Sequence, residues 1–347
     1  MPLVADMFGD RDLLHAAHKH VRLAGGLASG IGDRDLIDAL HMLDEGQEPI
    51  GVVYGTGFED RPELLSRIAE RWPLLGNSAS VVARLKDPQT FSLICSDLDI
   101  PSPEISLFEP SSRNGWLAKR VGGAGGAHIK YADQSADARG GFYYQRKVLG
   151  TPVSACFLAD GERAHVLGFS AQWSSPTPRQ PYRYGGAVRP AALTSDAADK
   201  LTDAVQRIVA AAGLVGLNSA DFLVHGERFW LLEINPRPGA TLDIFETGET
   251  SLFARHVASC SGKLAPAYSY PTNAKAASIV YAEQDVDCLS VLDWPDWAAD
   301  LPMAGSRIQA GEPVCTVYAS DAEAEVAMEL AEKRRQTVLF WTHARAR

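Results

Sequence analysis

Polar and apolar side chains alternate at the end of one predicted strand. Residues 230–240, WLLEINPRPGA, begin with an apolar run that two prolines stop abruptly. Because strand side chains alternate between faces, Glu233, Asn235 and Arg237 should share one face, with Leu232 and the following isoleucine on the other. An acid, an amide oxygen and a guanidinium make a poor core face. They are typical of an ion-binding site.

The preceding segment, SADFLVH, has the same alternation and predicts a β-hairpin with this strand. With a three-residue turn, His225 faces Phe229 and Asp221 faces Glu233. Two facing carboxylates repel each other unless a cation lies between them. Oxygen ligands from Asp221, Glu233 and Asn235 suit Mg²⁺, with phosphate oxygens completing its coordination. The alternative is a solvent-exposed polar face of a sheet.

The remaining pattern predicts an alternation of helices and short strands. Helical spacing of apolar residues predicts helices around Phe91–Cys95 and over residues 61–72, 196–212 and 321–336. Apolar runs predict strands over residues 2–8, 49–58, 115–121, 276–282 and 312–319, and several strands over 140–173. Residues 174–190, rich in proline and arginine, are expected to form a long loop.

A glycine-rich turn follows the strand that carries Lys119. Its glycines leave backbone N–H groups free to surround a phosphate, and a lysine beside them can neutralise its charge. No GK[ST] follows, and the spacing is not GxGxxG, so this is neither a Walker A nor a dinucleotide motif. An ordinary surface turn is the alternative interpretation. The glycines are Gly122, Gly123, Gly125 and Gly126.

Composition limits the classes of protein to which the chain can belong. A length of 347 residues predicts two or three subdomains, and a net charge of −10 argues against nucleic-acid binding. Five cysteines without a CxxC pair are typical of reduced thiols, and Cys315 is expected to be a buried apolar residue rather than a nucleophile. No apolar run approaches about 18 residues. We therefore expect a soluble, cytoplasmic protein without membrane contact, and leave open whether it forms a homodimer.

The order of these features resembles the ATP-grasp superfamily, most specifically in ADFLV followed by WLLEINPRPG. The resemblance implies a fold of α/β and α+β parts, in which an N-terminal pre-ATP-grasp α/β domain precedes two lobes that clamp ATP and Mg²⁺ between them. The implied divisions are residues 1–78 for the first domain and 79–262 for the lobes. Within the lobes, a glycine flap occupies about 113–150 and a metal-binding part about 151–262. A β-rich subdomain with a terminal helix follows over 263–347.

The resemblance also implies site residues. Lys86 and Lys119 match the lysines that hold nucleotide phosphates, and the glycine loop matches the flap over the β- and γ-phosphates. Asp221, Glu233 and Asn235 match the magnesium ligands. Arg237 matches the arginine that steadies the transferring phosphate or the acyl-phosphate.

The segment YYQRKV resembles the strand that meets adenine in this superfamily. There, backbone atoms of Arg146, Lys147 and Val148 would contact the base, and Gln145 stands where a glutamate is common. The acid that often meets the ribose is missing, because residues 151–153 read Thr-Pro-Val. Phosphate and metal binding are therefore better supported than the contacts to ribose.

Most members of the superfamily activate a carboxylate as an acyl-phosphate that an amine or another nucleophile then attacks. The resemblance thus implies an ATP-dependent carboxylate–amine ligase acting on small molecules, with Arg183 a further candidate for binding the carboxylate. A solvated loop with incidental arginines is the alternative for Arg183. More distantly, the chain resembles ATP-grasp proteins of one-carbon cofactor biosynthesis, among them tyramine–glutamate ligase. Other interpretations are a biotin-carboxylase-like or purine-biosynthetic enzyme, and a non-catalytic ATP sensor.

Overall fold

The computed structural model describes residues 1–26, 30–134, 141–248, 251–264, 272–287 and 293–344. The chain forms two compact units. One consists of residues 51–272, and the other of residues 1–50 together with 273–347. The predicted site residues all belong to the first of these units.

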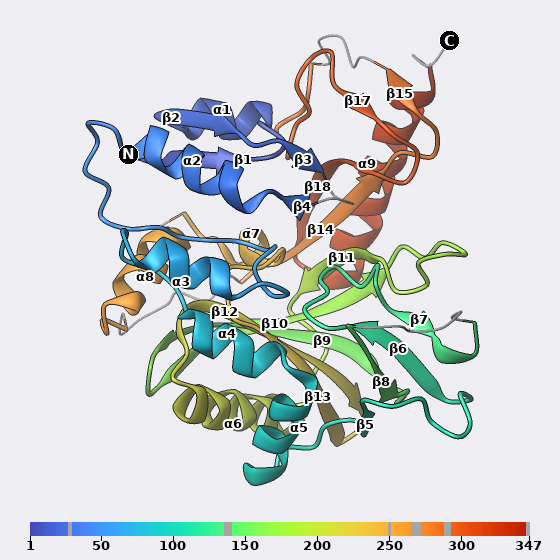
Figure 1. Ribbon diagram of the computed structural model, residues 1–347. Helices are drawn as coiled ribbons and strands as arrows, with labels where there is room; N and C mark the ends of the chain where they lie inside the picture. Colours follow the sequence, from blue (N-terminus) through green and yellow to red (C-terminus); the bar gives the residue numbers. More distant parts are fainter. Residues whose placement is uncertain (27–29, 135–140, 249–250, 265–271, 288–292, 345–347) are drawn as a thin grey trace. The chain divides into compact units, whose positions relative to one another are not determined.

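Unit 51–272 is built mainly on an antiparallel sheet. Its strands run in the order β13-β12-β9-β10-β11, and a smaller sheet has the order β5-β8-β6-β7 (Figure 1). The strands are β5 (Ile105–Ser106), β6 (Trp116–Arg120), β7 (Lys130–Tyr131), β8 (Phe142–Arg146), β9 (Thr151–Asp160), β10 (Ala164–Ser174), β11 (Tyr184–Arg189), β12 (Val215–His225) and β13 (Arg228–Asn235). The helices are α3 (Glu63–Ala69), α4 (Ala79–Lys86), α5 (Pro88–Asp97), the 3₁₀ turn η1 (Ala132–Gln134), α6 (Ser195–Ala212), α7 (Leu242–Phe245) and α8 (Leu252–Cys260).

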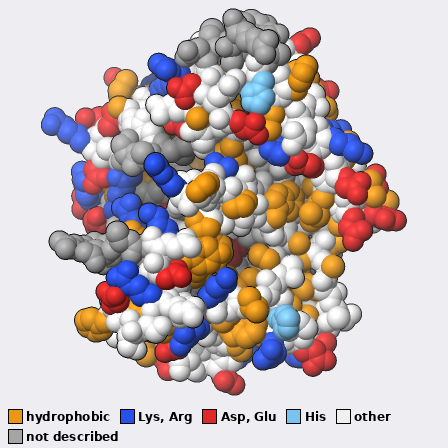
Figure 2. Space-filling view, turned by 90° about the vertical axis from the view of Figure 1, so that its right-hand side faces the viewer, with side chains coloured by type: hydrophobic (Ala, Val, Ile, Leu, Met, Phe, Trp, Pro, Cys, Tyr) orange, Lys and Arg blue, Asp and Glu red, His pale blue; other side chains and the backbone are white. Residues whose placement is uncertain are grey.

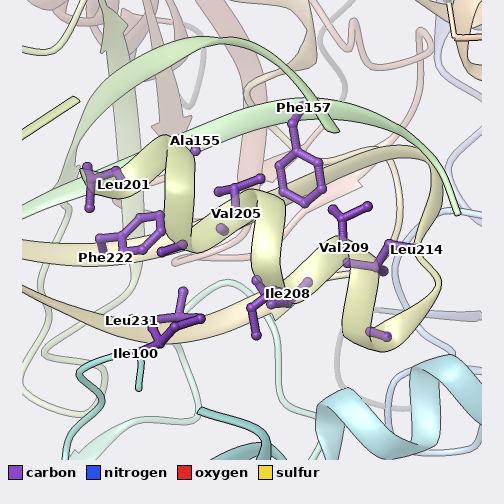
Figure 3. Close-up of a cluster of buried hydrophobic side chains, with 14 of the residues drawn as sticks. Ile100, Ala155, Phe157, Leu201, Val205, Ile208, Val209, Leu214, Phe222 and Leu231 are labelled. Carbon is purple, nitrogen blue, oxygen red and sulfur yellow. The ribbon is translucent and has the colours of Figure 1, made fainter. Parts of the chain in front are cut away.

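Helix α6 supplies much of the core of this unit. Its buried stripe includes Leu201, Val205 and Ile208, which pack with Phe157 of β9 and Phe222 of β12 (Figure 3). The spacing of three and four residues in the stripe is the one predicted from the sequence. This packing fixes one face of β9 and β12, so that their other face is free to carry polar groups.

Local signals set where the helices before the sheet begin. Ser78 accepts a hydrogen bond from the Val81 amide at the start of α4, and Asp87 accepts one from Thr90 at the start of α5. Pro88 occupies the first position of α5, where its missing N–H costs nothing. Lys86 is consequently the last residue of α4, directly before a sharp break in the chain.

The β12–β13 hairpin confirms the predicted pairing of Asp221 with Glu233 but not the predicted turn. His225 pairs with Arg228 rather than with Phe229. A β-bulge between Asp221 and the next residue takes up the difference of one residue. The prediction of the turn was wrong, and the carboxylates still face each other because the bulge shifts the register back.

Two other predictions from the pattern are corrected. Residues 49–58 do not form a strand: Val52 makes only an isolated bridge to Leu74, because glycines and a turn interrupt the apolar run. The expected loop of residues 174–190 ends in a strand, β11. Its sequence YGGAVR is short and apolar enough to pair with β10.

The second unit, residues 1–50 and 273–347, has its own core. Helix α9 packs on β14 and β18, around buried residues that include Val280, Val317 and Leu339. Strands β14, β18 and β16 are antiparallel neighbours, and β1 and β2 pair in parallel. The elements are β1 (Leu3–Asp6), α1 (Arg11–Ala16), β2 (Lys19–Arg22), β3 (Gly25–Gly26), β4 (Gly30–Ile31), α2 (Asp33–Asp44), β14 (Ala274–Tyr281), β15 (Val286–Asp287), β16 (Ala298–Ala299), β17 (Arg307–Ile308), β18 (Pro313–Asp321) and α9 (Ala324–Ala344).

The charged side chains on the surface and the free cysteines are as expected from the composition. Figure 2 shows acidic and basic side chains interspersed over the face that it displays. Among the described helices, none is long and apolar enough to cross a membrane. Four cysteines in the described ranges are free, with Cys315 buried as expected, whereas Cys288 lies outside those ranges.

A buried histidine joins α8 to the start of β12. His256 Nδ1 accepts a hydrogen bond from the Leu217 amide at 2.8 Å, and Nε2 lies 2.8 Å from the Leu75 carbonyl oxygen. This pattern requires a neutral ring with the proton on Nε2. Burial lowers the pKa of His256 and outweighs the opposing effect of the bond to Leu75.

We therefore expect His256 to make stability depend on pH. Because the folded-state pKa lies below the unfolded value, the stabilisation is complete above about pH 6.5 and is lost as the pH falls below it. At pH 7, His256→Asn should cost on the order of 1–3 kcal/mol, and this cost should shrink towards pH 5. Urea unfolding between pH 5 and pH 8 measures it, with the exposed His225→Asn as control. An equal cost at every pH would contradict the assignment.

Candidate functional site

Polar side chains of β9, β12 and β13 meet on the face of the sheet opposite α6. Ser154 Oγ donates to Asp221 Oδ1 at 2.6 Å, and Asn235 Nδ2 donates to Asp221 Oδ2 at 3.0 Å. Glu233 pairs directly with Asp221 across the hairpin. The structure thus brings together the three side chains that the sequence predicts as oxygen ligands of a metal ion.

Lys86 reaches this cluster from the end of α4. Its Nζ lies 2.9 Å from Asn235 Oδ1 and 3.3 Å from Glu233 Oε2. The side chain of Lys86 is only 6% exposed, so the ammonium is largely withdrawn from water. A positive charge therefore already lies against two of the three oxygen donors.

The facing carboxylates have opposite pKa shifts. Burial and the neighbouring charge of Glu233 raise the pKa of Asp221 to about 6. Burial also disfavours the charged form of Glu233, but Lys86, Lys119 and His128 outweigh it and lower the pKa of Glu233 to about 2. Glu233 is therefore ionised, whereas Asp221 holds a proton more readily than a free aspartate does, and a further cation would lower its pKa again.

These residues fit a magnesium ion. Carboxylate and amide oxygens are the ligands that this hard cation prefers, and each oxygen keeps a lone pair beyond the hydrogen bonds given above. The described residues contain no group of three or more His, Cys, Asp or Glu side chains suited to a metal ion. A metal here would therefore depend on the amide oxygen of Asn235 and on oxygens of a bound substrate.

Lys119 lies on β6 beside the same cluster. Its Nζ is 3.3 Å from Gln145 Oε1 and 5.9 Å from the ring centre of Tyr143, both on β8. Burial alone would lower the pKa of Lys119, but Tyr143, Glu233 and Asp221 raise it above its ordinary value. The ammonium is held charged in a buried place, as a phosphate-binding lysine requires.

A cavity connects these groups with the glycine loop. Lys86 and Lys119 enter it from two different elements, and Glu233 enters it from a third. Leu232 also lines this cavity, contrary to the predicted alternation, because the β-bulge breaks the period-two pattern at this point. The full lining is Leu85, Lys86, Pro88, Phe91, Lys119, Arg120, Gly122, Gly123, His128, Tyr143, Leu232 and Glu233.

The glycine loop is packed on both sides. Gly122, at φ +68°, lies against the backbone of Asp60, where an added Cβ would come within 2.6 Å. Gly126, at φ +70°, lies against the carbonyl oxygen of Tyr182. Gly125 has a similar φ of +66° but faces open space. The loop can therefore adopt this position only with glycine at Gly122 and Gly126.

We expect Gly126→Ala to weaken MgATP binding about tenfold or more, because a Cβ would collide with Tyr182 and displace the loop. Gly125→Ala is the matched control: it imposes the same left-handed strain, on the order of 1 kcal/mol, without a collision. Calorimetric titration of both variants with MgATP separates the two effects. Equal affinities for the two variants would mean that the packing against Tyr182 is irrelevant to binding.

His128, at the end of the glycine loop, was not identified from the sequence. Its ring lies against Gly123 and lines the cavity with Glu233 and Lys119. Burial lowers the pKa of His128 to about 4, and the two lysines add to this. A histidine in a loop gives no periodic signal, so only its position in the fold reveals it.

The predicted adenine-binding segment is partly committed to other bonds. The amide of Arg146 donates to the Glu104 carbonyl at 2.8 Å, and the amide of Lys147 donates to Gly115 at 2.9 Å. Contacts of these two residues to a base would therefore have to use their carbonyl oxygens. Gln145 is buried, and its Oε1 accepts a hydrogen bond from Lys119 Nζ at 3.3 Å.

Arg183 is bonded within its own loop. Its Nε donates to the Ser175 carbonyl at 2.9 Å and its Nη2 to Ser175 Oγ at 3.1 Å. These bonds hold the loop together, and a role in binding substrate stays a prediction.

Arg237 follows the end of β13 and lies against the segment before α3. Its Nε donates to Glu59 Oε1 at 2.7 Å, and its Nη1 donates to the Pro238 carbonyl at 3.1 Å. Glu59 is buried, with its side chain 3% exposed, and the side chain of Arg237 is 11% exposed. Glu59 is a second residue that the sequence analysis missed; the only signal was an acid after a glycine-rich turn.

One known protein family matches the middle of the chain. Residues 90–241 match the family model described as an ATP-grasp domain. That segment contains Lys119, the glycine loop and the three oxygen donors, whereas Lys86 and Glu59 precede it. This segment is therefore similar to an ATP-grasp domain, and the predicted fold class, an ATP-grasp fold of α/β and α+β parts, is confirmed.

The curated relatives are distant and much longer. The carbamoyl phosphate synthase large chain of Rubrobacter xylanophilus is 23% identical over 246 residues, which is 59% of this chain and 22% of that protein. The corresponding protein of Thermus thermophilus is 25% identical over 234 residues, again covering 22% of its length. The chain thus spans about a fifth of the length of these relatives.

Solved structures extend the likeness of fold to nearly the whole chain. The biotin carboxylase–beta-gamma-ATP complex from Campylobacter jejuni has a TM-score of 0.73 and 14% identity, covering 94% of this chain and 83% of that one. The biotin carboxylase domain of 2-oxoglutarate carboxylase from Hydrogenobacter thermophilus, in complex with MgADP, ADP and bicarbonate, has a TM-score of 0.71 and 12% identity. It covers 94% of this chain and 83% of that one.

Proposed function

We propose that the protein is an ATP-dependent ligase that activates a small carboxylate as an acyl-phosphate for attack by an amine. The main support is that Lys86, Lys119 and Glu233 all line one cavity. Asn235 donates a hydrogen bond to Asp221 and accepts one from Lys86. Phosphoryl transfer needs positioning and charge neutralisation more than a protein nucleophile. This cavity is suited to those two tasks.

The proposed reaction has two steps. A carboxylate oxygen of the acid attacks the γ-phosphorus of ATP, and the bond to the β–γ bridging oxygen breaks to release ADP. The amine then attacks the acyl carbon, phosphate leaves with the bonding electron pair, and the amine loses a proton. The products are an amide, ADP and phosphate.

The residues have separate roles in this scheme. Lys86 and Lys119 bind nucleotide phosphates, and the glycine loop covers them and excludes water. Mg²⁺ bound by Asp221, Glu233 and Asn235 would neutralise charge on the phosphate oxygens. Ser154 keeps Asp221 oriented through its 2.6 Å hydrogen bond. Arg237 binds the carboxylate and then the transferred phosphoryl group.

An amino acid of the glutamate type, used in cofactor biosynthesis, is the proposed acid. The support is the sequence resemblance to ligases of that kind, together with a guanidinium next to the metal-binding strand. Small-molecule partners also suit a chain of net charge −10, which would repel nucleic acid. We place the reaction in the cytoplasm, where ATP is abundant.

Bicarbonate is the second candidate for the acid. The likeness of fold to biotin carboxylase over 94% of this chain supports it. In that case the acyl-phosphate would be carboxyphosphate, formed by the same attack on ATP. The proposed roles of the lysines and of Arg237 would be unchanged.

A pooled screen tests the proposal. Purified protein with MgATP is offered carboxylates, including glutamate, formate and bicarbonate, together with a pool of amines, and the release of ADP and phosphate is measured. Mass spectrometry of active pools identifies the product. Release of ADP that depends on both an acid and an amine supports the ligase. Tight binding of MgATP without turnover in any pool would support a sensor instead.

A further inference from the structure

The segment before α3 contains a buried acid that the matched domain does not include. Glu59 Oε2 accepts hydrogen bonds from the amides of Gly57, at 2.7 Å, and Phe58, at 3.0 Å. Its other oxygen, Oε1, accepts from Thr56 Oγ1 at 3.3 Å and from Arg237 at 2.7 Å. With these bonds and an exposure of 3%, the carboxylate has one fixed orientation.

This carboxylate determines which part of Arg237 is available to a ligand. Nε donates to Glu59 and Nη1 donates to Pro238, so two of the three guanidinium nitrogens are bonded to protein. Within the part of the chain that the structure describes, Nη2 has no such bond. Its two N–H groups are therefore left for a ligand. The ion pair with Glu59 fixes the plane of the guanidinium in which they lie.

Two further residues, one before α3 and one after it, hold the backbone before Arg237. The Pro236 carbonyl accepts a hydrogen bond from Asn77 Nδ2 at 2.9 Å and from Tyr54 Oη at 3.4 Å. Together with the hydrogen bond from the Arg237 amide to the Asn235 carbonyl at 2.9 Å, these contacts hold the backbone from which the guanidinium extends.

Charge favours the same arrangement. Burial would raise the pKa of Glu59, but Arg237 and Lys86 outweigh it, and the pKa lies below its ordinary value. The pair is therefore ionised, with bonds between charged groups that are shorter and stronger than neutral ones. A free arginine side chain would lose roughly 2 kcal/mol of rotamer freedom on meeting its ligand, and the ion pair removes much of that cost beforehand.

We propose that Glu59 is a positioning residue for Arg237, holding its guanidinium so that Nη2 meets the carboxylate substrate and the transferred phosphoryl group. This inference rests on the proposed function. It assigns to Glu59 an effect on phosphoryl transfer, through Arg237, and none on the binding of MgATP.

Glu59→Gln tests the inference with the acid identified in the pooled screen. The glutamine can still accept the backbone hydrogen bonds but loses the charge that fixes Arg237. We expect kcat for ADP release to fall about 10- to 100-fold, with the Kd for MgATP unchanged within about twofold. In an Arg237→Met background, Glu59→Gln should cause no further fall in kcat. Glu63→Gln, an exposed acid on α3, is the control for loss of charge.

Nuclear magnetic resonance tests the same inference whether or not an acid is found. In ¹⁵N-labelled protein, the Arg237 Nε–H should exchange slowly with water, and Glu59→Gln should restore fast exchange. Arg34, whose side chain is 95% exposed, provides the fast reference. Fast exchange at Arg237 in the parent, or full kcat in Glu59→Gln, would overturn the inference. Absence of turnover with slow exchange would refute the ligase and leave the positioning of Arg237 supported.

Discussion

Replacement of Arg237 by lysine is expected to lower acyl transfer about 10²- to 10³-fold, the range found when one preorganised donor to a developing charge is removed. Lysine keeps the charge but has one nitrogen in place of three. It cannot donate to Glu59 and Pro238 at 2.7 and 3.1 Å and still present a third nitrogen to a ligand. Binding of MgATP should be nearly unchanged, because Lys86 and Lys119 are the residues proposed to bind the phosphates.

Hydroxylamine trapping measures this effect directly. With ATP and the acid substrate, the acyl-phosphate reacts with hydroxylamine to give a hydroxamate that can be quantified. Arg84→Lys, an exposed position on α4, is the matched control and should match the parent protein. If Arg237→Lys formed hydroxamate at the parental rate, Arg237 would have no role in transfer.

The second large effect is expected for Glu233→Gln, which should lower magnesium-dependent turnover about 100-fold or more. Glu233 has the lower pKa of the two carboxylates and also bonds Lys86, so its loss is expected to affect both the proposed metal and a lysine proposed to bind phosphate. Glutamine keeps the shape and an oxygen donor but not the charge. The fold should be retained, because Asn235 still bonds both Lys86 and Asp221.

Calorimetry with ATP at increasing Mg²⁺ concentrations measures the metal-dependent part of the affinity, and circular dichroism checks the fold. Glu227→Gln, exposed in the turn of the same hairpin, controls for the loss of one negative charge. An unchanged dependence on Mg²⁺ in Glu233→Gln would remove the metal assignment. A general weakening in Glu227→Gln would instead indicate a long-range effect of net charge.

Local regularities were predictable from the sequence. The stripe of α6 and the alternation of β13 follow from the periods of the helix and the strand, which are set by backbone geometry alone. The pairing of Asp221 with Glu233 was predicted from that alternation, but it holds only because a bulge offsets a turn that is one residue shorter than predicted. Lys119 was placed beside the glycine loop because the two are neighbours in the chain.

The tertiary structure decided what those regularities could not. A bulge moved Leu232 into the cavity, since the stagger of a hairpin depends on packing along its whole length. Lys86 reaches Glu233 across 147 residues, and Glu59 reaches Arg237 across 178. A buried charge needs a partner, but a local sequence pattern does not say which residue that partner is. Only the folded chain determines which residue lies within reach.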